Sequence, residues 1–500
     1  MKLFASLIIV LGFIHAYVAI TTIQSETFLY WQSTIIYIQL IVEIFIFFQI
    51  AIMIWSYAGI VHYNDNYKTL EDLTEYPDID VFIPIRNGSA KYLEETIIAL
   101  KNQDYPQEKV HIIVADDTPN QELANLYKSI TLRHDVKLIY DNSNSKFKAG
   151  MLNIALKFAN SKYVCFFDHD QIPAQGILKH FINILEHNPQ YSFVQAKKMF
   201  KDLHNLSRVW SALLYLQFFE IMEKLKQNSK SVFFAGSTAC FRRNAINLVG
   251  GMPEDTFTED NELTIRLLLL GSIGTFTNKI GSLGTVPDGF VNQVAQLWRW
   301  SHGGTNVLSL YGLPVIKSKK LSIAQKIDII ATLSITPILV CVYIYSISFI
   351  PLIITGVDSP RLVIGTFSSL AIIPIIISST YIILATLAVV FSKEDERSEF
   401  KLSHLPGFFL IGLANNILIL SSGIFGLLRK LGPKSKRGLW MRDIKVIQIS
   451  FIGLIIGLIV EYFAINWFLD GFYSAILLIL VSSTLLPTFF IALYYVKIKP

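Results

Sequence analysis

Two aspartates separated by a single residue follow an apolar run near the middle of the chain. The run covers residues 163–167, and the carboxylates belong to Asp168 and Asp170. In an extended backbone, side chains two positions apart point to the same side, so both carboxylates can face one ligand. A few hard oxygen donors suit a divalent cation that takes its other ligands from a diphosphate and water. A solvated loop is the alternative interpretation, and the rest of the chain has to decide between them.

Other polar groups lie at the ends of expected elements. Asp116 and Asp117 follow another apolar run, where a carboxylate can accept hydrogen bonds from a nucleobase or a ribose. Lys148 precedes small residues at a helix start, which suits a phosphate contact. Glu259 and Asp260 open a further helix, where acids interact favourably with the helix dipole and often serve only as caps. Each feature alone has a plain structural explanation, so only their combination indicates a site.

An aromatic segment lies further along the chain. Residues 296–300 have the sequence Gln-Leu-Trp-Arg-Trp, and two tryptophans flanking an arginine have no simple explanation as core residues. The Ser-His-Gly-Gly sequence of residues 301–304 is interpreted as a polar turn beside them. The segment therefore suggests a platform on which a flat ring stacks.

The elements that must position these groups alternate between strands and helices. Strands are expected at 80–85, 110–115, 136–140 and 163–167, and helices at 90–102, 121–130, 149–159 and 261–270. Such alternation predicts an α/β domain with a mostly parallel sheet that is covered on both faces. Ligands bind at the carboxyl ends of strands in such sheets, and both acidic pairs lie at such ends. Two acidic strand ends at one edge favour a nucleotide-and-metal site over two unrelated loops.

Residues 204–228 are expected to form an amphipathic helix. Trp210 and Phe218 belong to its apolar face, whereas Glu223 and Lys226 fall elsewhere. A helix of this kind suits a membrane surface. A helix buried within the domain is the alternative, and the sequence alone leaves both open.

The composition of the whole chain points to a membrane. Of its 500 residues, 52% are hydrophobic and 16% are charged, and the mean hydropathy is +0.46. Soluble domains usually carry about 25% charged residues. The net charge of +5 is too small to indicate a nucleic-acid partner. The three cysteines lack the paired spacing of a zinc site or a disulfide framework.

Apolar runs flank the α/β region, and crossing a bilayer takes about 20 such residues. The run 3–23 is either a retained anchor or a cleaved signal peptide. The run 35–61 contains Glu43, which either has a function or faces a partner helix. Further runs follow the α/β region at 327–355, 362–391, 405–428, 446–468 and 472–496.

Basic residues set the expected orientation. The linkers 392–404 and 429–445 are rich in Lys and Arg, whereas the loops near 24–32 and 469–473 contain none. By the positive-inside rule, both basic linkers face the cytosol. The run 405–428 between them then cannot cross once, so an interfacial or re-entrant helix is expected there.

These features predict a multi-pass protein of the cell membrane that contacts membrane lipids. Residues 1–61 would form two transmembrane helices, and residues 62–312 a cytosolic α/β domain. Residues 313–500 would form about four further spans and interfacial helices.

Taken in order, the motifs resemble those of the membrane-embedded family 2 glycosyltransferases. That family includes the cellulose synthase catalytic subunit, and hyaluronan and chitin synthases are related. The motifs are Lys148-Ala-Gly, Asp168-x-Asp170, Thr258-Glu-Asp260 and Gln296-x-x-Arg299-Trp300. The similarity covers essentially the whole chain, and four motifs in this order with compatible spacing are specific.

This resemblance implies a GT-A-like, Rossmann-like fold and an inverting, metal-dependent hexosyltransferase. The donor would be a nucleotide-activated sugar, commonly UDP-linked. Asp117, with Asp116 beside it, would bind the uridine end. Lys148 and Asp168 would hold the diphosphate, and Asp170 would ligate Mg²⁺ or Mn²⁺.

The resemblance also assigns the acceptor side. Asp260 would be the general base that deprotonates the acceptor hydroxyl, and Glu259 would join the substrate-binding residues. Gln296, Arg299 and Trp300 would bind the diphosphate leaving group and stack the acceptor sugar.

Two further segments resemble parts of these enzymes, and a third departs from them. Residues 233–237 resemble the segment that lines the acceptor entrance, and the basic linker 429–445 resembles a gating loop. Residues 84–88 have the sequence Pro-Ile-Arg-Asn-Gly, where the family commonly has Pro-Thr-Tyr-Asn-Glu. Recognition of the base is therefore expected to differ there.

The chemistry is coherent on physical grounds. One carboxylate activates the acceptor hydroxyl, and attack from the face opposite the leaving group inverts the anomeric centre. A cation neutralises the departing diphosphate. Such a site needs one base and one metal, not the paired carboxyl groups of a retaining glycosidase.

Three classes of function are weighed. The preferred one is a processive polysaccharide synthase that passes its product through its own membrane segments. Transfer of a single sugar to a lipid, such as a polyprenyl phosphate or a ceramide, is the enzymatic alternative. A transporter or scaffold would not require Asp168, Asp170 and Asp260 together.

Overall fold

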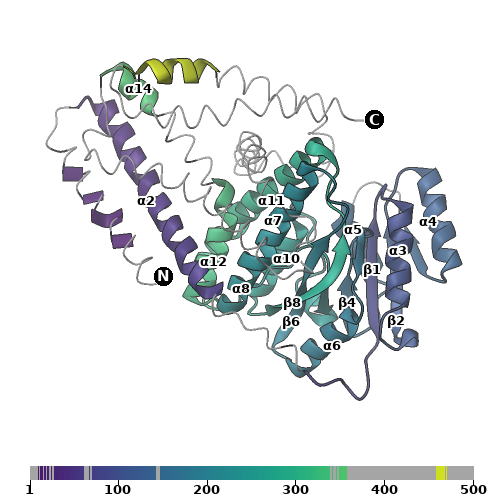
Figure 1. The fold of residues 1–500 in the computed structure, drawn as a ribbon. Coiled ribbons are helices and arrows are strands. Elements are labelled where there is room, and N and C mark those ends of the chain that lie inside the picture. Colours follow the sequence, from purple (N-terminus) through teal and green to yellow (C-terminus); the bar gives the residue numbers. More distant parts are fainter. Residues whose placement is uncertain are drawn as a thin grey trace.

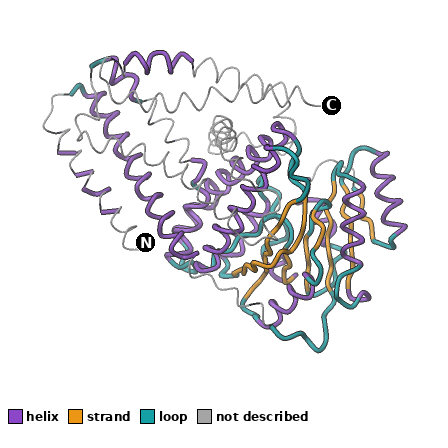
Figure 2. Tube along the Cα trace, viewed as in Figure 1, coloured by secondary structure: helices purple, strands orange, loops and turns teal. Residues whose placement is uncertain are grey.

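The computed structural model describes the α/β region almost completely and the flanking regions in part. It covers residues 28–60, 70–141, 147–337, 348–356 and 458–467, the single positions 67, 341, 345 and 469, and scattered positions between 9 and 24. Figures 1 and 2 show a sheet with helices on both faces, joined to a helical part that includes α2 (Tyr30–Ile60).

The strands of the described region form one mixed sheet of eight strands, in the order β3-β2-β1-β4-β7-β6-β8-β5. The first four of these run parallel to one another, as do β6 and β8, whereas β7 is antiparallel to both neighbours and β5 is antiparallel to β8. The strands are β1 (Ile79–Ile85), β2 (Val110–Asp116), β3 (Lys137–Tyr140), β4 (Tyr163–Phe166), β5 (Gln171–Pro173), β6 (Tyr191–Phe200), β7 (Ala239–Arg242) and β8 (Ile273–Gly284). The expected α/β fold with a mostly parallel sheet is confirmed.

Apolar strand residues supply a core on each face of the sheet. Successive strand side chains point to opposite faces, so Val81 and Ile83 of β1 belong to one core and Phe82 to the other. Helices α3, α4 and α6 cover the first face, and α5, α9 and α10 cover the second. Their bounds are α3 (Ala90–Lys101), α4 (Gln121–Arg133), α5 (Phe147–Leu156), α6 (Ile177–His187), α9 (Arg243–Leu248) and α10 (Glu259–Leu269).

A long helix, α11 (Gly289–Lys317), follows the sheet and contains the aromatic segment. The polar turn expected at 301–304 is wrong, because these residues are helical. A Cβ on Gly303 would lie 2.4 Å from Cγ2 of Thr258, just before α10. The glycine therefore permits the close approach of two helices rather than a turn. Helix α12 (Ile323–Leu333) follows and packs against α11.

The amphipathic helix expected at 204–228 is divided and buried. Its parts are α7 (Leu206–Gln217), the π-helical η2 (Phe218–Glu223) and α8 (Lys224–Ser229). Trp210 is buried, but so are Glu223 and Lys226 of the expected polar side. The three parts contact β6, β8, α11 and α12. The structure therefore matches the buried alternative rather than a helix on a membrane surface.

Helix α2 lies within the region expected to span a membrane and pairs with a segment after α12. Three hydrogen bonds join them: Gln32 Nε2 to Thr355 Oγ1 (3.1 Å), Gln39 Nε2 to Ser348 Oγ (2.8 Å) and the Tyr345 hydroxyl to Glu43 Oε1 (2.5 Å). Glu43 thus faces a partner element, as one of its two interpretations required. Helix α14 (Phe349–Ile354) belongs to the same segment.

No helix among the described residues is both long and apolar enough to cross a membrane. The expected runs 362–391, 405–428 and 472–496 lie outside the described residues, as do the basic linkers 392–404 and 429–445. The run 446–468 is described only at 458–467.

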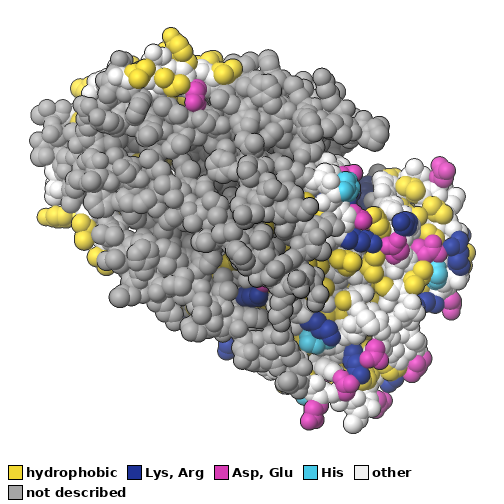
Figure 3. Space-filling view, in the orientation of Figure 1, with side chains coloured by type: hydrophobic (Ala, Val, Ile, Leu, Met, Phe, Trp, Pro, Cys, Tyr) yellow, Lys and Arg dark blue, Asp and Glu magenta, His cyan; other side chains and the backbone are white. Residues whose placement is uncertain are grey.

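The surface of the α/β part carries charges of both signs. On the face drawn in Figure 3, basic and acidic side chains are interspersed over this part of the molecule. This distribution agrees with the small net charge of +5.

Candidate active site

The Asp168 and Asp170 pair lies at the carboxyl end of a central strand. β4 is placed between β1 and β7, and the backbone N–H of Phe167 donates to the Phe82 carbonyl at 3.1 Å, which continues the pairing up to the acidic turn. Asp170 accepts a hydrogen bond from Thr285 Oγ1 at 2.9 Å. Both aspartates are partly exposed, so a ligand can reach them.

Lys148 contacts the first of these carboxylates. Its Nζ lies 2.6 Å from Asp168 Oδ1 and donates to the Gly236 carbonyl at 3.0 Å. Burial favours the neutral lysine, but the charges of Asp168 and Glu259 outweigh burial and raise the pKa of Lys148. Burial opposes ionisation of Asp168 as well, yet the ammonium groups of Lys148 and Lys198 lower the pKa of Asp168 to about 2. The pair is therefore charged on both sides at neutral pH.

Asp260 joins this pair through Gly236. Asp260 lies in the first turn of α10. Gly236 has a φ of +77°, and a Cβ there would lie 3.0 Å from Asp260 Oδ2 and 3.9 Å from Lys148 Nζ. Burial and the neighbouring Glu259 raise the pKa of Asp260 to about 7. The structure thus brings the expected base next to the expected diphosphate-binding lysine.

A second lysine, which the sequence analysis missed, also lies in the site. Lys198 is 3% exposed, and its Nζ donates to the Ala235 carbonyl at 2.8 Å. Burial lowers the pKa of Lys198 to about 8, although the negative charge of Asp168 opposes this. Lys197, its neighbour in β6, pairs with Glu220 at 2.7 Å. The only sign of Lys198 in the sequence was a pair of adjacent lysines inside a largely apolar segment.

The aromatic segment meets the site through another missed residue, Tyr215 of α7. Gln296 Nε2 donates to the Tyr215 hydroxyl at 2.9 Å, and the Trp300 ring packs edge-on against the Tyr215 ring with centroids 5.0 Å apart. Burial and the charge of Asp168 raise the pKa of Tyr215, whereas Arg299 opposes this. Tyr215 therefore joins α7 to the aromatic segment of α11. Arg299 is exposed.

Trp298, the other tryptophan of the segment, has a structural role. Its ring stacks on His302 with centroids 4.9 Å apart and packs edge-on against Phe257 at 6.0 Å. Only Trp300 of the two expected stacking residues contacts Tyr215.

The Asp116 and Asp117 side chains differ in their surroundings. Asp116 is fully buried, its Oδ1 accepts from the Thr118 N–H at 2.8 Å, and burial raises its pKa. Asp117 Oδ2 lies 2.5 Å from Arg86 Nη1. Arg86 belongs to the segment that departs from the family sequence. Asp117 is thus the member of the pair that interacts with a side chain of the neighbouring strand end.

The two acidic strand ends share one edge of the sheet. β1 pairs in parallel with both β2 and β4, and residue Ile85 of β1 is opposite Asp116. The loop after β1 approaches the second acidic turn closely, because a Cβ on Gly88 would lie 2.2 Å from Nε2 of His169. The glycine that replaces the family's glutamate therefore leaves room for His169.

The donor set can be tested against a divalent cation. No group of three or more His, Cys, Asp or Glu in the described part of the chain is arranged to hold a metal ion. Asp168 and Asp170 offer two carboxylates at one strand end, and oxygen donors suit Mg²⁺ and Mn²⁺. The two carboxylates fit a cation whose other ligands come from a diphosphate and water.

Comparison with known proteins identifies the domain. Residues 80–250 match the family described as "Glycosyl transferase family 2". This segment is a family 2 glycosyltransferase domain. The resemblance expected from the motifs is therefore confirmed. The glycosyltransferase domain contains Asp116, Asp117, Lys148, Asp168 and Asp170, whereas Asp260 and the α11 residues lie beyond the matched range.

Curated relatives share this glycosyltransferase domain. A cellulose synthase catalytic subunit [UDP-forming] from Pseudomonas fluorescens (strain SBW25) is 26% identical over 236 residues, which is 46% of this chain and 31% of that protein. A probable glucomannan 4-beta-mannosyltransferase 7 from Oryza sativa subsp. japonica is 27% identical over 327 residues, which is 57% of this chain and 55% of that protein. The chain spans less than two thirds of the length of these relatives.

A solved structure also resembles the chain. The mannosyltransferase from Pyrobaculum calidifontis in complex with GDP-Man and Mn²⁺ is 20% identical, with a TM-score of 0.45. The match covers 69% of this chain and 99% of that one.

Proposed function

We propose that this protein is a membrane-bound glycosyltransferase that transfers a sugar from a nucleotide-sugar donor to a growing polysaccharide with inversion. The observation that carries the proposal is the convergence of Lys148, Asp168 and Asp260 around Gly236, at the carboxyl edge of a family 2 glycosyltransferase domain. The donor is UDP-linked in this proposal, as the name of the UDP-forming relative supports.

Asp260 is the general base of the proposed reaction. It removes the proton from the acceptor hydroxyl, whose oxygen attacks the anomeric carbon of the donor sugar. The bond from that carbon to the diphosphate oxygen breaks, and the nucleoside diphosphate leaves from the opposite face. A base works best when its pKa lies near the working pH, and the pKa of Asp260 is raised to about 7.

Basic groups of the chain balance the charge of the leaving group. Lys148 and Lys198 bring two ammonium groups to the carbonyls of residues 235 and 236, beside the acidic strand end. Asp170, together with Asp168, would hold Mg²⁺ or Mn²⁺, which supplies further positive charge to the diphosphate when it is bound. Asp116 and Asp117 lie at the end of β2, which is separated from β4 by β1, and the nucleoside of the donor is proposed to bind there.

The acceptor binds on the side of α11 in this proposal. Trp300 and Tyr215 provide aromatic rings that suit the apolar face of a sugar, and Gln296 is hydrogen-bonded to Tyr215. Arg299 is exposed and can bind the leaving diphosphate. Glu259 completes the set of substrate-binding residues beside Asp260.

The proposed location is the cell membrane, with the catalytic domain on the cytosolic side. The apolar runs on both sides of residues 62–312 and the basic linkers 392–404 and 429–445 support it. Residues 1–61 and 313–500 would carry the spans, and the product would pass between the latter. The linker 429–445 would act as a gating loop over bound nucleotide.

Activity of the purified chain tests this function directly. In detergent or nanodiscs with Mg²⁺ or Mn²⁺, we expect release of UDP from one of a panel of nucleotide sugars and growth of a polysaccharide. Release of GDP would show that the donor is GDP-linked, and addition of a single sugar to a lipid would show that the acceptor is a lipid. Absence of turnover with every donor would overturn the enzymatic function.

The variant Asp260→Asn tests the base. Loss of the base should reduce transfer by about 10²- to 10⁴-fold and leave nucleotide binding unchanged. Asp255→Asn is a suitable control, because Asp255 is exposed in the preceding loop and pairs with Arg266 at 3.3 Å. Full activity of Asp260→Asn would show that the base has been assigned to the wrong residue.

A further inference from the structure

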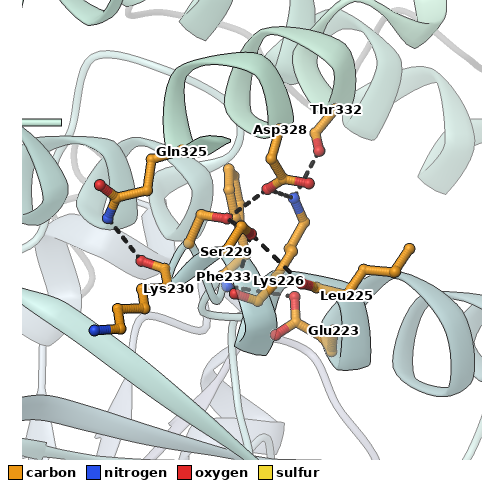
Figure 4. A network of polar contacts seen from close by, with 10 residues as sticks. Glu223, Leu225, Lys226, Ser229, Lys230, Phe233, Gln325, Asp328 and Thr332 are labelled. Atoms are coloured by element: carbon orange, nitrogen blue, oxygen red, sulfur yellow. Dashed lines mark hydrogen bonds and ion pairs between the residues drawn. The ribbon is translucent and has the colours of Figure 1, made fainter. Parts of the chain in front are cut away.

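A buried network of polar groups joins α8, the segment that follows it and α12 (Figure 4). Lys226 of α8 is 1% exposed, and its Nζ lies 2.7 Å from Asp328 Oδ2 and 2.6 Å from Thr332 Oγ1, both on α12. Ser231 Oγ donates to the same Asp328 oxygen at 2.6 Å. A single carboxylate of α12 therefore binds both a buried lysine and the beginning of the segment 231–237.

The π-helical η2 supplies a second attachment for this segment. π-Helical turns are rare and often occur at functional sites. Glu223, the last residue of η2, is fully buried, and its Oε1 accepts from the Phe233 N–H at 3.3 Å. Lys226 Nζ lies 4.4 Å from the centroid of the Phe233 ring. Phe233 is thus held through its backbone and its ring by the same network.

Side chains hold the rest of the segment 231–237 as well. The segment does not pair with a strand of the sheet. Side chains instead form hydrogen bonds with several of its backbone N–H and carbonyl groups. The bonds run from Phe234 N–H to Thr264 Oγ1 (3.0 Å), Ala235 N–H to Gln195 Oε1 (2.8 Å), Lys198 Nζ to the Ala235 carbonyl (2.8 Å) and Lys148 Nζ to the Gly236 carbonyl (3.0 Å). Five residues of extended chain reach at most about 18 Å, so Asp328 is attached to the site by a short connection.

Helix α12 contacts the acceptor side through apolar packing too. Phe233 shares one buried cluster with Ile265 of α10, Val307 of α11 and Ile329 of α12. Helix α10 begins with the proposed base, and α11 carries Trp300. Helix α12 therefore shares a buried core with the two helices that carry the proposed base and Trp300.

We propose that Lys226, Asp328 and Ser231 are positioning residues for the acceptor step. By fixing the segment 231–237 to α12, they hold Gly236 in the place where it borders Asp260. This inference rests on the proposed function, because it assigns the segment to the acceptor side of that same site. A network that serves stability alone would leave the kinetic constants of the folded enzyme unchanged.

Two variants separate positioning from stability in the full chain. Ser231→Ala removes the hydrogen bonds of the Ser231 hydroxyl to Asp328 and to Ser229 and leaves the buried ion pair intact. The double variant Lys226→Met/Asp328→Leu removes both charges together, and such apolar replacement of a buried pair is often neutral for stability. We expect its midpoint of thermal unfolding to stay within about 3 °C of the wild type.

Kinetics with an oligosaccharide that the wild type extends, chosen from cello- and manno-oligosaccharides, give the decisive readout. We expect both variants to raise KM for this acceptor, or to lower kcat, by about five- to tenfold, with the Kd for UDP unchanged. Asp80→Asn is the matched control. Asp80 is a buried carboxylate that accepts from the N–H groups of residues 160 and 161 at the opposite end of β1. The Asp80→Asn substitution should lower the free energy of unfolding and leave KM and kcat unaltered.

The outcomes separate this inference from the proposed function. Wild-type kinetic constants in both folded variants would overturn the positioning role while the enzyme still transfers sugar. A wild-type chain that transfers no sugar would overturn the proposed function, and the positioning role with it. A weaker Kd for UDP in Ser231→Ala would also contradict the inference, because the segment would then act on the donor.

Discussion

Asp168 and Asp260 show how similar residues acquire different properties within one site. Both are aspartates, but Asp168 pairs with Lys148, whereas Asp260 has the acid Glu259 as its neighbour. Their pKa values are displaced in opposite directions, to about 2 and about 7. Such a separation is typical of sites in which one carboxylate binds charge and the other handles a proton.

The pH dependence of transfer follows from the pKa of Asp260. The proposed base must be ionised, so kcat/KM should fall about tenfold per pH unit as the pH drops below about 7. Lys198 lowers this pKa by its positive charge, so Lys198→Met should move the acid limb to higher pH. Initial rates measured across about pH 4 to 9 locate this acid limb, because the range covers both the ordinary and the raised pKa of an aspartate.

The control for this profile is Lys201→Met. Lys201 pairs with Glu95 at 3.1 Å and makes no hydrogen bond to the segment 231–237 among those described. Its profile should match the wild type. An acid limb near the ordinary pKa of an aspartate, about 4, would contradict the raised value.

Gly236 offers a test of the closest contact in the site. An alanine there must adopt a φ of +77° and place its Cβ 3.0 Å from Asp260 Oδ2. Gly250→Ala is matched, because Gly250 has a φ of +82° and open space around it. Both variants should lose about 1–2 kcal/mol of unfolding free energy. Only Gly236→Ala should also lose transfer activity, and equal activity in the two would argue against a close arrangement of Gly236 and Asp260.

At the scale of elements, the parallel half of the sheet could be predicted, because β1 to β4 are apolar runs that alternate with helical segments, whereas β5 to β8 were not expected from the sequence. The strand expected at 80–85 and the helix at 90–102 are present within a residue at each end. The turn expected at 301–304 was wrong, because two adjacent glycines in a sequence do not reveal that Gly303 of α11 packs against Thr258 at the start of α10. Lys198 and Tyr215 were missed for a similar reason. Strand β6 and helix α7 bring them to the site from parts of the chain without a motif.

The close packing of α11 on α10 can be tested with two adjacent glycines. Gly303→Ala places a Cβ 2.4 Å from Thr258, so α11 must shift, at a cost of about 1–3 kcal/mol in unfolding free energy. Gly304→Ala meets nothing within 4 Å and should instead stabilise the helix by about 1 kcal/mol. Thermal unfolding measures both. Equal effects of the two substitutions would contradict the close approach.

At the scale of the whole molecule, the candidate site depends on segments that are far apart in the sequence. The matched family segment ends at residue 250, yet Asp260 and Trp300 lie beyond it. Packing of α10 on the sheet brings Asp260 close to Lys148, and packing of α11 on α10 and α7 brings Trp300 against Tyr215. The order of the motifs indicated this arrangement, but their distances could come only from the folded chain.

The hydrogen bonds of α2 have a consequence for the order of assembly. They join residues 302, 309 and 323 positions apart in the chain. A ribosome adds about 5–20 residues per second, so the partners of α2 emerge roughly 15 to 60 s after it does. The entire glycosyltransferase domain is synthesised in this interval. Pairing of α2 with its late partners must therefore follow the synthesis of the domain, and it brings together an early and a late part of the chain.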